Sequence, residues 1–338
     1  MQLRSEQEII NSWKYIDKVY ISVVCMTYNQ EQYIKTAINS FLQQECDYKF
    51  EIIIHDDAST DTTTEIIKEY AENYPSIIRV IQQVDNKYSQ KPTLPTLIAL
   101  NNTKAEYIAL CEGDDYWIST NKLQCQYLAM QEHKSLCISF HSSQNIYPNG
   151  SFQVGVSLGD LNKICLLSTV IRGGGAYMPT ASLMFTKELL ESFNQVLANA
   201  PVGDFYMQVL GSAANGALYI SGLESAYRKG NEGSWSESMS HSTEKKILKL
   251  LGQHKSSIKE LADFIPAEHK RDLEYALMHE YYVGARIALF SKNYVLFQSL
   301  ISKCKNSEEK FGIVYSFFCN FRNYPRLLLK AYLLFTRR

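Results

Sequence analysis

Hydrophobic residues in the first 141 positions fall into two alternating patterns. Short, continuous apolar runs are typical of strands that are buried on both faces of a sheet. Such runs predict strands at residues 19–26, 50–55, 77–82, 107–111 and 136–141. Between them, apolar residues at helical spacing predict helices over residues 30–44, 59–74, 94–101 and 121–133. Ser59 is expected to cap the second helix. The alternation favours a mainly parallel sheet with helices on both faces.

The pattern changes in the second half of the chain. A looser, glycine-containing stretch follows, with a strand expected at 181–185, a helix at 204–214 and a strand pair between 218 and 227. From about residue 242 onward helical periodicity dominates and glycine becomes rare, so we expect no strand there. Residues 273–290 and 294–304 predict a helical hairpin. The expected parts are an arm or short helix over 1–18, an α/β domain over 19–240 and a helical domain over 241–338.

Composition narrows the functional classes. The 338 residues are 46% hydrophobic, which is enough for a sizeable core, and the net charge of −1 lacks the basic field of a nucleic-acid binder. Eight cysteines occur without a C-x-x-C pair or zinc-ligand spacing, so we expect buried free thiols in a reducing cytosol. The polar N-terminus does not resemble a secretory signal, and no apolar window reaches the roughly 18 residues of a membrane span. A cytoplasmic location is therefore expected.

Clustered carboxylates follow two of the predicted strands. Asp56 and Asp57 come after the second strand, and Glu112, Asp114 and Asp115 come after the fourth. Open α/β sheets bind ligands at the carboxyl ends of their strands. Three acids within four residues repel one another unless a cation or a wet site relieves them, and Mg²⁺ is usually held by one or two carboxylates plus substrate phosphates. The pattern predicts a nucleotide-diphosphate site with a metal, the alternative being solvated turns.

The turn after the first predicted strand adds an aromatic residue to this edge. An aromatic ring can stack on a nucleobase, and a carboxylate can accept an N–H from the edge of that base. Tyr28 and Asp57 are residue types that could do both. The alternatives are that Tyr28 packs against the protein and that Asp56 and Asp57 form an Asx-turn leading to a helix cap.

Three motifs, in this order, resemble inverting glycosyltransferases of family 2, which have the GT-A fold. They are Val23–Asn29, Asp56–Asp61, and Glu112–Trp117 followed by Lys122-Leu123. More narrowly, the chain resembles the bacterial members that build surface polysaccharides, over roughly residues 19 to 236. The resemblance implies transfer of a sugar from a nucleotide-diphosphate sugar, with uridine as the base, to a hydroxyl of a glycan or lipid-linked acceptor.

The resemblance also implies roles for individual residues in donor binding. The loop with Thr27, Tyr28 and Asn29 would hold the base, and Asp56 or Asp57 would contact the uracil. Asp114 would lie near the ribose and diphosphate, and Asp115 would ligate Mn²⁺ or Mg²⁺. Glu112 stands where an aspartate is commoner in the family, which keeps the charge on an arm that is one methylene longer.

Two later segments resemble the catalytic parts of the family. Asp204, in the segment 201–205, corresponds to the catalytic base, although an Asp after Gly is also a good helix N-cap. Residues 227–236 resemble a loop that closes over the donor, where Arg228 or Lys229 would meet the diphosphate; the alternative is that both only cover the surface. Gly230 stands where many relatives have a histidine, which in some of them helps to hold the metal or the diphosphate, so the resemblance does not extend to that contact.

The C-terminal tail, residues 311–338, contains five basic residues and no acidic residue, mixed with Phe, Tyr and Leu. A basic amphipathic helix can lie on an anionic bilayer surface. This predicts peripheral membrane contact at the inner face of the plasma membrane, and the alternative is an ordinary helix packed on the helical domain.

Three other functions are compatible with parts of this pattern. A nucleotidyltransferase can share this sheet, but its phosphate loop usually carries glycine and basic residues, which 27–31 lack. A processive polysaccharide synthase usually has membrane helices and a Gln-x-x-Arg-Trp motif, and neither is present in the sequence. The last alternative is a non-catalytic nucleotide-sugar-binding protein, against which the joint presence of Asp57, Asp114, Asp115 and Asp204 argues.

Overall fold

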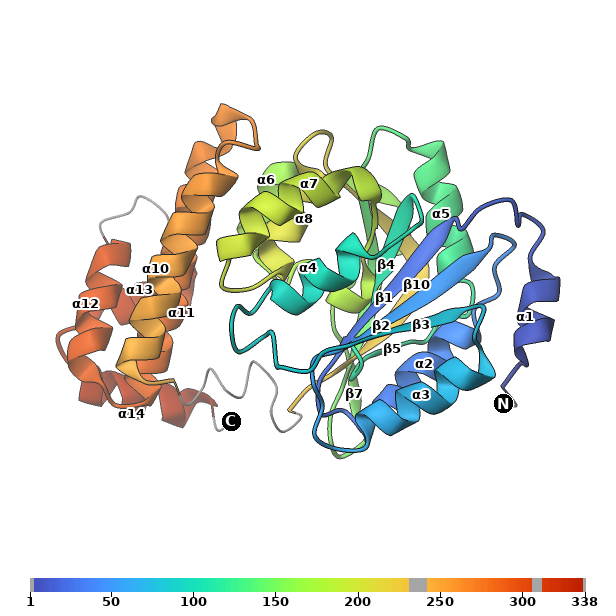
Figure 1. Ribbon diagram of the computed structural model, residues 1–338. Coiled ribbons are helices and arrows are strands. Elements are labelled where there is room, and N and C mark those ends of the chain that lie inside the picture. The colour runs from blue at the N-terminus through green and yellow to red at the C-terminus, as the bar shows by residue number, and fades with distance from the viewer. Residues whose placement is uncertain (1–2, 231–241, 306–311, 337–338) are drawn as a thin grey trace. The chain divides into compact units, whose positions relative to one another are not determined.

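The computed structural model describes residues 3–230, 242–305 and 312–336. The chain divides into two compact units, Met1–Lys229 and Gly230–Arg338. The first contains a sheet flanked by helices, and the described part of the second is helical (Figure 1).

Four parallel strands form the N-terminal half of the sheet, in the order β3-β2-β1-β4. They are β1 (Ile21–Thr27), β2 (Phe50–Asp56), β3 (Ile78–Gln82) and β4 (Tyr107–Leu110). All seven residues of β2 are buried, as the continuous apolar run predicts. In the register, Thr27 at the end of β1 pairs with Asp56 at the end of β2. The first turn and the first acidic turn therefore begin at the same level of the sheet.

The other half of the sheet is mixed. Beyond β4 the order continues β9-β6-β10-β5, with β7 beside β6 and β8 beside β10. These strands are β5 (Tyr116–Trp117), β6 (Ile138–Ile146), β7 (Phe152–Val154), β8 (Lys163–Cys165), β9 (Met184–Thr186) and β10 (Ala217–Arg228). Only the β6–β10 pair is parallel here. The strand pair expected at 218–227 is instead one long strand, β10, with an irregularity between Ile220 and Glu224.

Eight α-helices accompany this sheet in the described part of the first unit. They are α1 (Glu6–Ser12), α2 (Ile34–Leu42), α3 (Thr63–Asn73), α4 (Leu94–Asn101), α5 (Lys122–Glu132), α6 (Leu167–Gly173), α7 (Leu190–Val196) and α8 (Asp204–Ser212). Short 3₁₀ turns occupy Thr180–Ser182, Lys187–Leu189 and Leu197–Asn199, so the strand expected at 181–185 starts later. The expectation that Ser59 caps α3 is wrong: the N-cap is Thr62, and Ser59 bonds to Asp56 instead.

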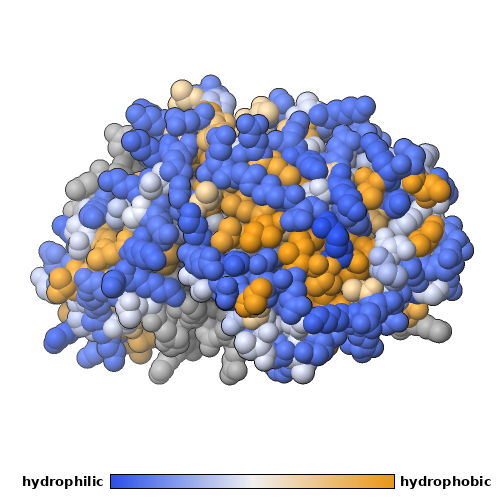
Figure 2. All heavy atoms as spheres, viewed as in Figure 1, coloured by the Kyte–Doolittle hydropathy of each residue, from blue (hydrophilic) through white to orange (hydrophobic). Residues whose placement is uncertain are grey.

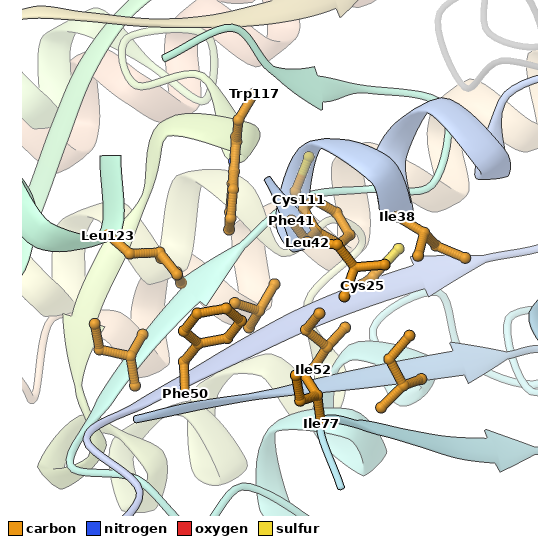
Figure 3. Packing of buried hydrophobic residues seen from close by; sticks show 14 of the residues in the cluster. Cys25, Ile38, Phe41, Leu42, Phe50, Ile52, Ile77, Cys111, Trp117 and Leu123 are labelled. Atoms are coloured by element: carbon orange, nitrogen blue, oxygen red, sulfur yellow. The ribbon is translucent and has the colours of Figure 1, made fainter. Parts of the chain in front are cut away.

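The core of the first unit lies between the sheet and its helices (Figure 3). Trp117 packs on Phe41 with ring centroids 4.7 Å apart, and its indole N–H donates to the Ala181 carbonyl at 2.8 Å. Ile9 of α1 is fully buried in the same cluster, so the N-terminal arm packs onto this unit. These contacts fix Trp117, which follows the acidic turn directly.

The second unit contains five α-helices and a 3₁₀ turn within residues 242–305 and 312–336. They are α10 (Glu244–Leu261), Ala267–His269 (3₁₀), α11 (Lys270–Phe290), α12 (Tyr294–Lys305), α13 (Ile313–Asn320) and α14 (Pro325–Thr336). The expected hairpin corresponds to α11 and α12, which pack in one apolar cluster with the later helices. Within the described residues, no helix is long and apolar enough to cross a membrane. All eight cysteines are free, and six of them are buried.

Candidate active site

Both acidic turns flank the end of β1. The Cys111 and Gly113 N–H groups donate to the Val24 and Met26 carbonyls, at 3.1 and 2.9 Å, so the chain after β4 continues beside β1. On the other side, the Asp57 N–H donates to the Thr27 carbonyl at 3.0 Å. The prediction that the two turns meet at one sheet edge is therefore consistent with the backbone hydrogen bonds.

Gly113 stands where no larger residue fits without rearrangement. A Cβ atom there would lie 2.4 Å from Gln30 Oε1 and 2.9 Å from Thr27 Oγ1. Those two side chains are held in place because the Thr27 hydroxyl donates to Gln30 Oε1 at 2.8 Å. The glycine between Glu112 and Asp114 thus lets the acidic turn approach the loop that follows β1.

The loops after β1 and β2 are joined by side-chain hydrogen bonds. Asn29 has a left-handed backbone conformation, with φ of 51°, which Asn tolerates better than most residues. Its side-chain oxygen accepts the Thr60 N–H at 2.7 Å, and its own N–H donates to Ser59 Oγ at 3.0 Å. Asn29 and Thr27 therefore shape the loop from within, whereas Tyr28 is 44% exposed and free to receive a planar ring.

Asp56 and Asp57 are both buried but have different partners. Asp56 accepts hydrogen bonds from the Ser59 N–H, the Ser59 hydroxyl and the Thr64 hydroxyl, which occupy both of its oxygens. The Asp57 carboxylate instead accepts the backbone N–H groups of Lys87 and Tyr88, at 2.7 and 2.9 Å. Asp56 organises its own turn, and Asp57 ties a second loop to the sheet edge.

The loop held by Asp57 reaches the acidic cluster through Tyr88. Tyr88 is 47% exposed overall; partial loss of hydration raises the pKa of its hydroxyl, and the charge of Glu112 raises it further. Tyr88 lies in the irregular segment before α4, where no periodicity or motif distinguishes it in the sequence. Tyr88 is thus near enough to Glu112 for its charge to act on the hydroxyl, and it is not among the site residues predicted from the sequence.

Four carboxylates from two distant segments lie within electrostatic reach of one another. Burial raises the pKa of Glu112 well above its usual range, followed by the charges of Asp204, Asp114 and Asp115. Burial and the Asp114 charge also raise the pKa of Asp115. Burial raises the pKa of Asp204, and a hydrogen bond from the Thr180 side chain opposes that shift. Asp204, the first residue of α8, therefore belongs to the same acidic cluster as residues 112–115.

The end of β10 brings two basic side chains to this cluster. The Arg228 backbone N–H donates to Asp115 Oδ1 at 2.9 Å, and the Arg228 guanidinium donates to the Asp114 carbonyl. That guanidinium also lies 5.0 Å from the Tyr33 ring centre and 4.8 Å from that of Tyr116. Arg228 thus holds the acidic turn.

The neighbours of Arg228 face the same carboxylates. Lys229 Nζ lies 4.2 Å from the Tyr227 ring centre; burial lowers the pKa of Lys229, and the Asp115 charge opposes this. Burial, and then the charges of all four acids, raise the pKa of Tyr227 to about 12. Tyr227 opens the segment predicted to close over the donor, but the resemblance implies no role of its own for it. Residues 231–236 of the expected closing loop lie outside the described residues.

The carboxylate oxygens of this cluster are ligands that suit a hard divalent cation. Asp115 Oδ1 accepts the Arg228 N–H, and its other oxygen has no hydrogen bond to a described residue. Mutual repulsion and burial both disfavour the charged forms of Glu112 and Asp115, and a cation would relieve both effects. Within residues 3–230, 242–305 and 312–336, no three His, Cys, Asp or Glu side chains are grouped to hold a metal by themselves. Such a cation would need water or substrate oxygens as further ligands.

A buried lysine lies behind the acidic turn. Lys122 is fully buried at the start of α5, with Nζ 4.4 Å from the Trp117 ring centre. Its ammonium has no hydrogen-bond partner among the described residues, and neither has Nε2 of the buried His141. Burial lowers the pKa of Lys122 to about 7 and, together with the Lys122 charge, lowers that of His141 to about 3.

Replacing Lys122 with Met is expected to stabilise the fold at neutral pH. The pKa of Lys122 falls from 10.5 to about 7 on folding, so below pH 10.5 the unfolded chain binds a proton that the native state disfavours. The Met variant should unfold with a free energy roughly 1–4 kcal/mol higher near pH 7, and the difference should shrink as the pH rises toward about 10. Urea unfolding at both pH values measures it, with the exposed Lys134→Met as the control. An equal gain at both pH values would contradict the explanation.

Comparison with known proteins finds a family match within the sheet-bearing unit. Residues 22–152 match the model of glycosyl transferase family 2. The uncharacterized protein Rv1520 of Mycobacterium tuberculosis is 32% identical over 219 residues, covering 64% of this chain and 60% of that protein. The Escherichia coli UDP-Glc:alpha-D-GlcNAc-diphosphoundecaprenol beta-1,3-glucosyltransferase WfaP is 32% identical over 162 residues, covering 45% and 59%. The chain thus spans about three fifths of the length of these relatives.

Solved structures share the fold. The crystal structure of TarS from Staphylococcus aureus aligns with a TM-score of 0.61 at 18% identity, covering 92% of this chain and 53% of TarS. A mannosyltransferase from Pyrobaculum calidifontis aligns with a TM-score of 0.56 at 12% identity, covering 98% and 94%. These likenesses confirm the GT-A-type fold, a mixed sheet flanked by helices with a helical C-terminal region. They agree with the motifs at the sheet edge, and the match to glycosyl transferase family 2 lies within this fold, over residues 22–152.

Proposed function

We propose that the chain is a glycosyltransferase. It would transfer a sugar from a nucleotide-diphosphate sugar, a UDP-sugar, to a hydroxyl of a glycan or lipid-linked acceptor in bacterial surface-polysaccharide synthesis. The observation that carries this proposal is the electrostatic proximity of Asp204 to the acids at the end of β4. It unites a donor-side acidic turn with a separate carboxylate that could act on an acceptor.

The proposed donor site runs along the sheet edge. The exposed Tyr28 would stack on the base, and Asp57 would accept an N–H from it through a remaining lone pair. Asp56 is the weaker candidate for this contact because Ser59 and Thr64 already occupy its oxygens. Uridine is favoured because WfaP is named for UDP-Glc and TarS was crystallised with UDP-GlcNAc.

The diphosphate would lie over Asp114 and Asp115. Lys229 is better suited than Arg228 to contact it, because the Arg228 guanidinium already bonds the Asp114 carbonyl and stacks on two rings. Asp115 and Glu112 would hold Mn²⁺ or Mg²⁺, and the Pyrobaculum neighbour was solved with GDP-Man and Mn²⁺. When bound, this cation would stabilise negative charge on the leaving diphosphate.

Asp204 is the proposed general base. Its carboxylate would take the proton of the acceptor hydroxyl while that oxygen attacks the anomeric carbon from the face opposite the diphosphate, so the configuration inverts. Thr180 orients this carboxylate, and burial raises its pKa toward the pH range where a base works best. The raised pKa also predicts that activity falls as the pH drops through it.

Nucleotide-sugar binding and turnover test the proposal. A thermal-shift screen of UDP-glucose, UDP-N-acetylglucosamine and GDP-mannose, each with and without Mn²⁺, should give one ligand that stabilises the chain only with the cation. UDP release from that ligand should then separate a catalyst from a mere binder. A nucleotidyltransferase would instead convert UTP and a sugar 1-phosphate into a UDP-sugar and pyrophosphate. Stabilisation by none of the three nucleotide-sugars in Mn²⁺ would overturn the donor assignment.

A further inference from the structure

The two faces of α14 differ, although both carry leucines. Leu328 and Leu329 are buried in the apolar cluster of the helical unit, and Tyr332 packs against it. On the other side, Arg326, Leu327, Lys330, Leu333 and Leu334 are all exposed, and we call them the α14 outer face. The Arg326 guanidinium also lies 5.8 Å from the ring centre of Tyr294 in α12, at the edge of this face. Leu327 is 65% and Leu334 73% exposed. The two sequence-based alternatives for the tail therefore apply to opposite faces of one helix.

The exposed apolar surface continues into the turn before α14. Tyr324 is 62% exposed and Phe321 is 48% exposed. Phe321 is supported from behind by Phe317, with ring centroids 4.8 Å apart. Isolated exposed apolar residues need no explanation, but large ones gathered around basic side chains mark an interaction surface.

The charge pattern identifies the partner. Residues 311–338 carry five basic and no acidic residues, whereas residues 242–280 of the same unit carry seven of each sign. In Figure 2, the face of the helical unit turned to the viewer, where α10 lies in Figure 1, is mostly hydrophilic. Residues 281–305 share this bias, with four basic residues and no acidic residue, so the mixture of apolar and cationic side chains distinguishes the later helices of the unit from α10 and the start of α11.

We propose that the α14 outer face, with Phe321 and Tyr324, docks on an anionic lipid bilayer. At 12 residues and about 18 Å, α14 is too short to span a membrane, so it would lie in the interface with its leucines among the acyl chains. Arg326 and Lys330 would meet the phosphates of the headgroups. Such docking would bring the enzyme to a lipid-linked acceptor, and this purpose rests on the proposed function. The docking itself does not depend on that function.

Vesicle flotation tests the docking. The full chain is incubated with vesicles of phosphatidylcholine, with or without phosphatidylglycerol, at two salt concentrations. We expect binding that requires phosphatidylglycerol and weakens with salt. Arg326→Gln with Lys330→Gln should reduce it by roughly tenfold or more, at about fivefold for each charge. Leu327→Ser with Leu334→Ser should reduce it by roughly tenfold through lost apolar burial.

Matched controls separate this docking from general charge effects. Lys245→Gln with Lys249→Gln removes two exposed charges from α10 of the same unit and should leave flotation unchanged. All variants change exposed side chains, so their unfolding midpoints should match the wild type. Lys330→Glu alone also changes the net charge by two units, through a single substitution, and should reduce flotation to a similar extent. Equal binding to both vesicle types, or equal loss in the α10 control, would overturn the proposal.

Two further outcomes have defined meanings. If the leucine variant breaks up a dimer in analytical ultracentrifugation and leaves flotation unchanged, the face is an interface between two copies and the proposal is wrong. UDP release without vesicles should be the same in wild type and surface variants. A surface variant that no longer floats but still releases UDP would therefore support the docking without bearing on the proposed function. A wild type that releases no UDP would contradict the proposed function without bearing on the docking.

Discussion

Replacing Asp204 with Asn is expected to abolish sugar transfer while leaving donor binding intact. The amide keeps the shape of the side chain at the start of α8 but cannot take a proton from the acceptor hydroxyl. Loss of a positioned base lowers the rate by roughly 10²–10⁴-fold. The rate of transfer and the donor dissociation constant should be measured on the same preparation. Asp160→Asn, at an exposed position of the same unit, is the control.

A companion variant tests the same role through pH. The Thr180 side chain opposes the rise in the pKa of Asp204, so Thr180→Val should raise that pKa further. A base works only when deprotonated, so the acidic limb of the pH–rate profile should move to higher pH. A merely structural role for Thr180 would lower the rate at every pH instead. Normal turnover by the Asn variant would remove Asp204 from the mechanism.

The strands that could be predicted from the sequence are those whose burial does not depend on distant partners. β1 and β2 are buried on both faces and read as unbroken apolar runs. β5, β7 and β8 contain two or three residues each and exist because they pair with β10 and β6, whereas β9 was expected from its apolar run but begins three residues later. A two-residue strand has no periodicity, so its presence follows from the tertiary structure alone.

The site divides in a similar way. The acids after β2 and β4 could be predicted to share an edge, because parallel neighbours end at the same level. Asp204 could be assigned only through the resemblance, since an Asp after Gly also describes a helix cap. The different partners of Asp56 and Asp57 depend on where the loop at Lys87 returns, which no local pattern encodes. Tyr88 comes near Glu112 for the same reason, whereas Tyr227 lies in the segment that the resemblance already places over the donor.

Asp115→Asn is expected to change stability and donor binding in opposite directions. The amide oxygen can still accept the Arg228 N–H, so the turn keeps its shape, but one negative charge leaves a cluster in which the acids raise each other's pKa. Without ligands, the variant should therefore unfold at a higher temperature than the wild type. Its affinity for a UDP-sugar in Mn²⁺ should fall by roughly 100-fold or more, because the cation loses a charged ligand.

Thermal shift measures both effects in one experiment. A donor at about 100 times its dissociation constant stabilises the wild type by roughly 2.7 kcal/mol, and the variant should lose nearly all of this in the presence of Mn²⁺. Excess chelator should bring the wild type down to its ligand-free unfolding temperature, below that of the variant, and should leave the variant nearly unchanged. Asp160→Asn should follow the wild type in every condition. If the wild type binds the donor equally well in chelator and in Mn²⁺, the carboxylates at the end of β4 have another purpose, and their repulsion must be relieved by protonation instead of a cation.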